Sequence, residues 1–279
     1  MSMFKPCKDC LLRPKAPGRS RCYPCYRKTR GITQHEPTRK ARTLYIDIET
    51  FPNLGYVWGQ WQQNLSLPQI VDFVEVACFG YKWAGDDEVT FVRENLVQVA
   101  WDLLNEADVV VHFYGSKFDI PHLNREFLQA NLGPPSPYKQ IDLKLAVAKR
   151  FKFTSNKLQH VSEAVGLAGK VSNEGWELWI KCMAGDAQAW ADMEEYNLQD
   201  VVLLEELHNI LLPWLPDAPH AYLYGGEEGS CPRCEGDLEP AGLARTKLSA
   251  FYQYKCLACG SFFRDSKRVM GVDIQDSVL

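Results

Sequence analysis

The sequence predicts a mixed α/β protein, in which one β-sheet is flanked by helices and a small cysteine-rich module lies at each end. Three observations lead to this fold class. Strand-like segments come first in the central part of the chain and then alternate with helix-like segments. A long amphipathic stretch closes that central part. Two cysteine quartets lie outside it, and a chain of 279 residues can bury a full core and still carry such modules.

The expected elements follow from hydrophobic periodicity. Apolar and polar residues alternate along Thr43–Thr50, which is the pattern of a strand. Further strand-like segments span residues 55–61, 73–82, 89–92 and 108–113. Helix-like segments span residues 94–106, 120–129, 143–151, 158–165, 176–183 and 187–212. Early neighbouring strands followed by strand–helix alternation favour a mixed sheet.

Charge and composition divide the chain into three expected domains. Residues 1–42 carry 12 lysines and arginines against two acidic residues, whereas residues 43–219 carry 12 against 25. Residues 220–279 are nearly neutral, with seven against eight. We therefore expect a basic module with its linker, an acidic central domain and a C-terminal module. A basic arm indicates a polyanionic partner, although such charge blocks also occur as plain solvated surface.

The sequence shows neither an apolar run long enough to cross a bilayer nor the apolar region of a signal peptide at its start. We expect a protein of the reducing cytoplasm, where it would have access to the nucleoid. Cysteines in that compartment favour metal sites over disulfides. Cys78 and Cys182, which belong to no pair, are expected to be core thiols.

Two carboxylates are expected on one face of the first strand. Residues i and i+2 of a strand share a face, so Asp47 and Glu49 point to one side while Ile46 and Ile48 point to the other. Neighbouring carboxylates repel each other unless a cation or a proton relieves the repulsion. A solvated acidic edge of the sheet would carry the same pair, so this segment alone leaves both interpretations open.

Two further acidic segments are candidates for the same site. Asp119 follows a strand-like segment and precedes the helix with Pro121, a position that also suits a helix N-cap. Asp200 lies on the apolar stripe of the long helix, one turn after Tyr196, so both face the same side. A carboxylate on a core-facing stripe is costly unless it is hydrogen-bonded, paired or bound to metal. Asp142 is a further acidic residue that we leave outside the candidate site.

These segments resemble the motifs of the DEDD group of 3′–5′ exonucleases, which are DnaQ-like proteins with a ribonuclease H-like fold. Asp47-Ile48-Glu49 is similar to the first motif and Phe118-Asp119 to the second. Tyr196-x-x-x-Asp200 is similar to the third motif in its tyrosine-bearing form. The first two motifs are most similar to those of the YprB-like subgroup and of the proofreading domains of B-family polymerases. The similarity covers about residues 43–212, with one departure: Tyr114-Gly115 stands where those relatives often have asparagine.

This resemblance implies a metal-dependent 3′–5′ exonuclease that prefers single-stranded DNA or a frayed 3′ end. Asp47, Glu49, Asp119 and Asp200 would hold two Mg²⁺ or Mn²⁺ ions, which clamp the attacking and leaving oxygens of the phosphodiester. Tyr196 would orient the attacking water, because an unperturbed phenol titrates at about 10 and is a poor base at neutral pH.

The two cysteine quartets have the spacing of structural zinc sites. Each combines two Cys-x-x-Cys segments, which bring four thiolates into tetrahedral reach of one Zn²⁺ and leave no open position. The expected ligands are Cys7, Cys10, Cys22 and Cys25 in the N-terminal module, and Cys231, Cys234, Cys256 and Cys259 in the C-terminal one, which resembles a zinc ribbon. Gly236 and Gly260 suit tight turns in the C-terminal module. An iron–sulfur cluster or redox-active dithiols are the other chemistries that this spacing permits.

Basic and aromatic side chains are candidates for contact with nucleic acid. They are Arg19, Arg21, Arg27 and Lys28 in the basic module, and Lys117, Phe118, Lys149, Arg150 and Lys152 in the central domain. We expect a monomer that binds DNA in preference to RNA and binds no membrane, and the sequence names no replication or repair partner. Within the enzyme class, the alternative is an exoribonuclease or a structure-selective nuclease. From another class, it is a zinc-dependent nucleic-acid-binding adaptor with an inactive nuclease-like core.

Overall fold

The computed structural model of the chain describes residues 8–9, 39–169, 175–215, 218–226 and 229–271. It contains two compact units, Met1–Arg39 and Lys40–Leu279, and nearly all of the described residues belong to the second. The N-terminal cysteine quartet and the basic residues predicted around it lie outside the described residues. The zinc site and the nucleic-acid contacts expected there therefore remain predictions.

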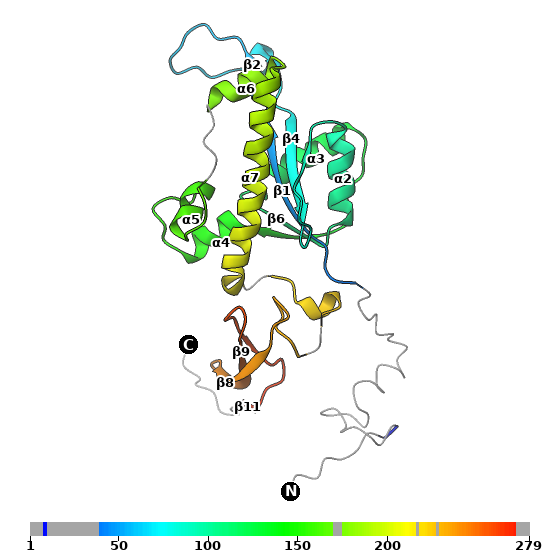
Figure 1. Cartoon of the computed structure of the whole chain (residues 1–279), viewed down its shortest axis with the longest axis vertical. Coiled ribbons are helices and arrows are strands. Elements are labelled where there is room, and N and C mark those ends of the chain that lie inside the picture. The colour runs from blue at the N-terminus through cyan, green and yellow to red at the C-terminus, as the bar shows by residue number, and fades with distance from the viewer. Residues whose placement is uncertain (1–7, 10–38, 170–174, 216–217, 227–228, 272–279) are drawn as a thin grey trace. The chain divides into compact units, whose positions relative to one another are not determined.

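A five-stranded mixed sheet forms the centre of the second unit (Figure 1). Its strands lie in the order β5-β4-β1-β6-β7. Their bounds are Thr43–Thr50 for β1, Val76–Trp83 for β4, Thr90–Val92 for β5, Val109–His112 for β6 and Lys139–Asp142 for β7. The β1–β4 and β4–β5 pairs are antiparallel, whereas β1–β6 and β6–β7 are parallel.

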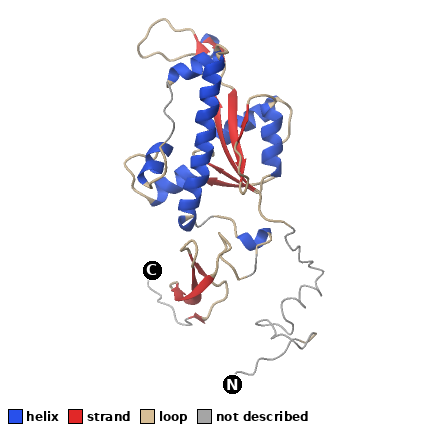
Figure 2. Ribbon diagram, in the orientation of Figure 1, coloured by secondary structure: helices blue, strands red, loops and turns tan. Residues whose placement is uncertain are grey.

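Helices cover both faces of this sheet (Figure 2). On one face lie α2 (Leu96–Glu106) and α3 (Asp119–Gln129). On the other lie α4 (Leu143–Arg150), α5 (Leu158–Ala164), α6 (Trp176–Met183) and α7 (Ala187–Leu211). The predicted mixed α/β fold class is confirmed. None of the helices in the described part of the chain is both long and apolar enough to cross a membrane.

Alternation along β1 decides which layer each of its side chains meets. Ile46 and Ile48 are buried against α2 and α3. Tyr45 is buried on the opposite face, in the cluster that α7 completes. Asp47 and Glu49 have the parity of Tyr45 and therefore share the α7 face, as the strand pattern predicts.

The segment after β1 differs from the prediction. The sequence pattern predicts a strand over residues 55–61, but only Leu54–Gly55 pairs, as β2, with β3 (Ile70–Asp72). A loop and the short helix η1 (Leu67–Gln69) connect them. Trp58 is 99% exposed and Trp61 83% exposed, so the apolar pattern here has no core to face. The other predicted strands and helices of the central part form, with ends displaced by up to three residues.

The C-terminal part forms a second, antiparallel sheet around β9 (Ser249–Cys256). Its other strands are β8 (Leu238–Arg245), β10 (Phe262–Arg264) and β11 (Met270–Gly271), and each pairs with β9. Two short helices, η2 (Leu212–Trp214) and η3 (Ala221–Tyr224), precede this sheet in the chain. Its cysteine cluster fits a zinc ribbon.

Because α7 packs on the sheet, truncating a buried side chain in their interface should lower the free energy of unfolding strongly. Leu204 of α7 is buried between the helix and the sheet, so Leu204→Ala should lower the free energy of unfolding by about 2–5 kcal/mol. Leu128→Ala on α3, where the side chain is 77% exposed, should change it by less than about 0.5 kcal/mol. Urea denaturation followed by circular dichroism measures both. Equal effects would contradict the assigned packing.

Candidate active site and cysteine cluster

Helix α7 packs closely against a glycine of β4. Gly80 lies opposite Asp47 in the β1–β4 register. A Cβ at Gly80 would lie 2.7 Å from the Asn197 Oδ1 and 3.0 Å from a methyl carbon of Val201. Because contacts this short are repulsive, the missing side chain of Gly80 is what allows α7 to lie so near the carboxylates of β1.

Asp47, Glu49 and Asp200 form one carboxylate cluster at this approach. One oxygen of each lies within 4.8 Å of the others. Asp200 is only 3% exposed, and the two β1 residues are half-buried. Charges this close are stable together when a cation or protons offset their repulsion. The donor set consists of hard oxygen atoms, which fits Mg²⁺ or Mn²⁺.

Tyr196 lies one turn before Asp200 on α7, in the arrangement that the helical spacing predicts. Its side chain is buried in a cluster with Cys78 and Met193. The tyrosine ring packs edge-on against Trp179 of α6, with ring centroids 6.2 Å apart. This packing restricts the ring to few orientations.

The Asp119 carboxylate is hydrogen-bonded to β1. Helix α3 begins at Asp119, its N-cap is Phe118, and no side-chain hydrogen bond caps it. The alternative that Asp119 serves as an N-cap is therefore wrong. Its Oδ1 accepts a hydrogen bond from the Ile48 amide at 3.1 Å. The β1–β6 pairing ends at Tyr45 and Val111, so Asp119 satisfies a strand amide that β6 no longer reaches.

This hydrogen bond places Asp119 beside the cluster without making it a member. Ile48 lies between Asp47 and Glu49 in the chain, whereas the group of mutually close oxygens found among the described residues comprises Asp47, Glu49 and Asp200. Burial and, to a lesser degree, the negative charge of Asp142 together raise the pKa of Asp119 to about 7, against the lowering effect of the backbone amides of Ile48 and of Asp119 itself. A nearby cation would favour the ionised form.

Asp142 organises the loop that leads into α3. Its carboxylate accepts hydrogen bonds from the Tyr114 amide at 3.0 Å, the Ser116 hydroxyl at 2.5 Å and the Leu145 amide at 3.1 Å. It thereby also caps α4. Gly115 is required in this loop, because a Cβ there would lie 2.5 Å from the His112 ring. The Tyr114-Gly115 departure from the motif thus has a structural reason.

Cys78 lies opposite Glu49 in the β1–β4 register and faces the same cluster. Burial, followed by the charges of Glu49 and Asp47, raises the pKa of its thiol above the usual range. Burial also raises the pKa of Cys182. Both cysteines are buried and form no disulfide, so the prediction that they are core thiols is confirmed.

Sequence reasoning missed Asn197, which the structure places directly against Asp47. The residue is fully buried on α7. Its Nδ2 donates to the backbone oxygen and to the Oδ2 of Asp47, both at 3.1 Å. The sequence did contain one indication of this contact. Asn197 lies next to Tyr196 on the buried side of a helix, and a buried side-chain amide needs a hydrogen-bond partner.

The predicted nucleic-acid contacts of the central domain lie on the surface. Lys117 and Phe118 are exposed immediately before Asp119, and the Phe118 ring lies 4.7 Å from that of His122. Lys149, Arg150 and Lys152 are exposed at the end of α4. The first two line a surface cavity of about 250 Å³ together with Asp142.

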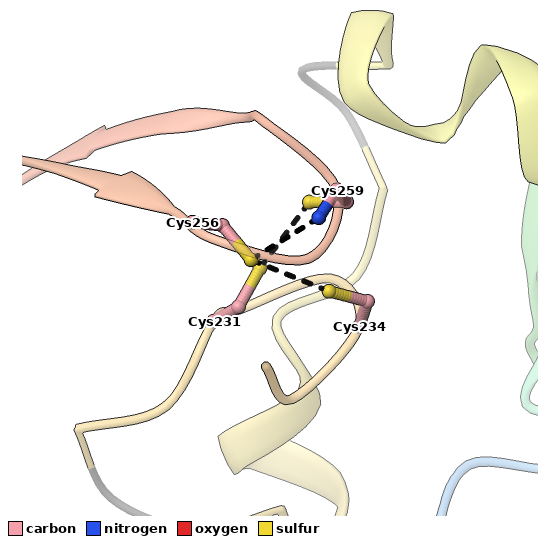
Figure 3. Close-up of side chains that lie close together, drawn as sticks. All are labelled: Cys231, Cys234, Cys256 and Cys259. Atoms are coloured by element: carbon pink, nitrogen blue, oxygen red, sulfur yellow. Dashed lines mark hydrogen bonds between the residues drawn. The ribbon is translucent and has the colours of Figure 1, made fainter. Parts of the chain in front are cut away.

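Four cysteines converge at one end of the C-terminal sheet (Figure 3). The sulfur atoms of Cys231 and Cys259 lie 3.7 Å apart, and those of Cys234 and Cys256 lie 3.6 Å apart. Four sulfurs at the usual zinc–sulfur distance of about 2.3 Å in a tetrahedron are about 3.8 Å from one another. The cluster therefore fits Zn²⁺ with four thiolate ligands.

Backbone groups complete this cysteine cluster. The amides of Arg233 and Cys259 donate to the sulfurs of Cys231 and Cys256, each at 3.4 Å. Such bonds favour the thiolate form that zinc requires. Gly260 has a φ of 73°, and a Cβ at Gly236 would lie 2.8 Å from the Cβ of Ala258, so both glycines serve the tight turns that the sequence predicts.

The comparisons with known proteins place this fold in a family. The RNase_H_2 family profile, described as RNase_H superfamily, matches residues 72–212, which is half of the chain. The chain belongs to the RNase H superfamily. The matched region includes Asp119, Tyr196 and Asp200 and begins after Asp47 and Glu49.

Among solved structures, the chain is similar to the family B DNA polymerase from the hyperthermophilic archaeon Pyrobaculum calidifontis. The two are 16% identical, with a TM-score of 0.48. The similarity covers 77% of this chain and 33% of the polymerase chain, so the matched region spans about a third of the polymerase's length. A comparison with curated proteins found no matching relative.

The pKa of Asp119 predicts a pH-dependent stability when Mg²⁺ and Mn²⁺ are absent. Between the unfolded pKa of about 3.9 and the folded pKa of about 7, the folded state retains a proton that the unfolded state releases. Stability should therefore fall as pH rises through this window. Asp119→Asn keeps an acceptor for the Ile48 amide without the charge, so it should be more stable than the wild type at pH 8, by roughly 4 kcal/mol.

Thermal and urea unfolding at pH 5 and pH 8 check this prediction. The difference between Asp119→Asn and the wild type should shrink at pH 5, where most of the wild-type side chain in the folded protein is protonated. A constant difference at both pH values would show that Asp119 is ionised in the folded protein throughout this range.

The cysteine cluster predicts that Gly236→Ala weakens zinc retention. The new methyl group would meet Ala258 and lie 3.2 Å from the Cys256 sulfur, so the turn must shift. Zinc release to a coloured chelator should be faster than in the wild type. Gly133→Ala, where a Cβ has no neighbour within 4 Å, is the matched control. Equal release from both variants would argue against this geometry.

Proposed function

We propose that this protein is a metal-dependent 3′–5′ exonuclease that hydrolyses the phosphodiester bonds of single-stranded DNA or of a frayed 3′ end. The observation that carries the proposal is the cluster of Asp47, Glu49 and Asp200, which β1 and α7 build on a fold of the RNase H superfamily. Asp119 lies beside this cluster, where it accepts a hydrogen bond from the Ile48 amide. Nucleases with this fold use divalent metals, and the oxygen-only donor set agrees with that chemistry.

The roles of the residues follow from their positions. Asp47, Glu49 and Asp200, with Asp119 beside them, would hold two Mg²⁺ or Mn²⁺ ions. When bound, such ions lower the pKa of a water and stabilise the charge on the departing 3′ oxygen. The strand and the helix that carry these carboxylates are packed against each other, and this packing holds the site in place. Tyr196, one turn from Asp200 and held by Trp179, would orient the attacking water through its hydroxyl.

Surface residues near the cluster suit a single strand. Phe118 is exposed next to Asp119, and an exposed aromatic ring can stack on a base whatever the sequence. Lys117, and beyond it Lys149, Arg150 and Lys152, would neutralise phosphates. Zinc in the C-terminal cysteine cluster would be structural, because four protein ligands leave no open position.

A time course on 5′-labelled single-stranded DNA and RNA of one sequence, with Mg²⁺ or Mn²⁺, tests this function. A ladder that shortens one nucleotide at a time from the 3′ end supports an exonuclease, and the faster ladder identifies the preferred sugar. Faster cleavage of RNA than of DNA would identify RNA as the preferred substrate. Intact strands that still bind the protein would instead indicate a nucleic-acid-binding adaptor.

Asp47→Ala should abolish cleavage and leave the binding of a single strand measurable, because it removes a metal ligand while the surface contacts remain. The loss should be at least about 10³-fold, as expected when electrostatic stabilisation of the transition state is removed. Asp102→Ala on α2, on the opposite face of the sheet, is the matched control and should cleave at the wild-type rate. Retained turnover in Asp47→Ala would rule out the assigned metal site.

Tyr196→Phe should slow cleavage by about 10²-fold, because it removes only the hydroxyl that orients the water and keeps the packing on Trp179. Binding of Mn²⁺ should be unchanged, which separates this variant from those of the carboxylates. Tyr252→Phe in β9 removes a hydroxyl from an exposed ring and should have no effect. Wild-type cleavage by Tyr196→Phe would disprove the assigned role.

A further inference from the structure

We propose that Asn197 is a positioning residue that holds Asp47 in the orientation in which it binds metal. The inference rests on the proposed function, because it concerns the same carboxylate cluster. Asn197 lies on α7, one residue after Tyr196 and three before Asp200. The same turn of helix would thus supply the water-orienting tyrosine, a metal ligand and the residue that fixes a second ligand.

The contacts of Asn197 with Asp47 are twofold. Its Nδ2 donates to the Asp47 Oδ2 and to the Asp47 backbone oxygen, both at 3.1 Å. One amide group therefore holds the carboxylate relative to its own backbone, which restricts rotation about the side-chain bonds of Asp47. The two residues are 150 positions apart in the chain, so this bond also links β1 to α7.

The surroundings of Asn197 leave its amide little freedom. The side chain is fully buried, and its Oδ1 lies where a Cβ on Gly80 would come within 2.7 Å. The opposite orientation of the amide would point its oxygen at the Asp47 carboxylate and cause repulsion instead of a hydrogen bond. The two Asp47 acceptors therefore determine which end of the amide faces the carboxylate.

The chemistry of asparagine suits this task. A neutral donor fixes a carboxylate without cancelling the negative charge that attracts a cation, whereas lysine or arginine would compete with the metal. Groups that orient metal ligands in this way typically account for 10–100-fold in metal affinity or activity. Asn197 has no assigned contact with substrate, so its effect is expected to act through metal binding.

Mn²⁺ binding to the full-length protein, counted by electron paramagnetic resonance without nucleic acid, tests the inference. Asn197→Ala should raise the Mn²⁺ dissociation constant by about 10–100-fold. Cleavage by this variant should recover toward the wild-type rate as Mn²⁺ is raised, whereas cleavage by Tyr196→Phe should not. Asn209→Ala, which removes an exposed asparagine from the same helix, is the matched control.

A second variant protects the test against a loss of folding. Asn197→Ser keeps a small polar group on the helix but is too short to span both Asp47 acceptors. It should weaken Mn²⁺ binding in folded protein, as judged by circular dichroism.

The outcomes separate this inference from the proposed function. Wild-type Mn²⁺ affinity in folded Asn197→Ala, with lowered thermal stability alone, would overturn the inference and leave the exonuclease proposal standing. Weakened Mn²⁺ binding in a protein whose wild type cleaves neither DNA nor RNA would support the positioning role and overturn the exonuclease. A wild type that binds no Mn²⁺ would overturn both.

Discussion

The close packing of α7 across β1 and β4 is the constraint on which the candidate site depends. It needs a position without a side chain on β4, and Gly80 provides it. Polar contacts link the helix to the sheet, among them Asn197 with Asp47 at 3.1 Å, Glu205 with Lys82 at 2.6 Å and His208 with Tyr45 at 2.9 Å. Because unmade hydrogen bonds are costly in a buried layer, these contacts fix the rotation and height of α7. Asp200 is thereby brought to the carboxylates of β1.

Burial along this interface also determines which groups carry charge. It lowers the pKa of His208 to about 4, so its ring is neutral at pH 7 and can accept the Tyr45 hydroxyl proton in a hydrogen bond. It raises the pKa of Asp119 to about 7 and that of the Cys78 thiol above the usual range. Asp47, Glu49 and Asp200 present hard oxygen atoms at this interface, and such donors suit divalent cations such as Mg²⁺ and Mn²⁺.

The chain combines two metal-binding chemistries, and each follows from its donor atoms. The carboxylate cluster would bind ions that keep positions open for water and substrate, as catalysis requires. The four sulfurs of the C-terminal cluster match a closed tetrahedron, and the small sheet around β9 has few apolar residues to bury. For so small a module, metal binding supplies folding energy that the core does not. One cluster is therefore suited to chemistry and the other to stability.

Local patterns in the sequence determined much of this protein. The two-residue period placed Asp47 and Glu49 on one face of β1, the helical period put Tyr196 one turn from Asp200, and the cysteine spacing indicated a four-sulfur cluster. These features depend on neighbours within a few positions, so periodicity is enough to predict them. Only the tertiary structure decided what depends on distant partners. Examples are the bond from Asn197 to Asp47 across 150 positions, the bond from the Ile48 amide to Asp119 across 71, and the need for glycine at position 80. These contacts depend on the strand register and on the position of α7 along the sheet. Neither of these produces a periodic pattern in the sequence.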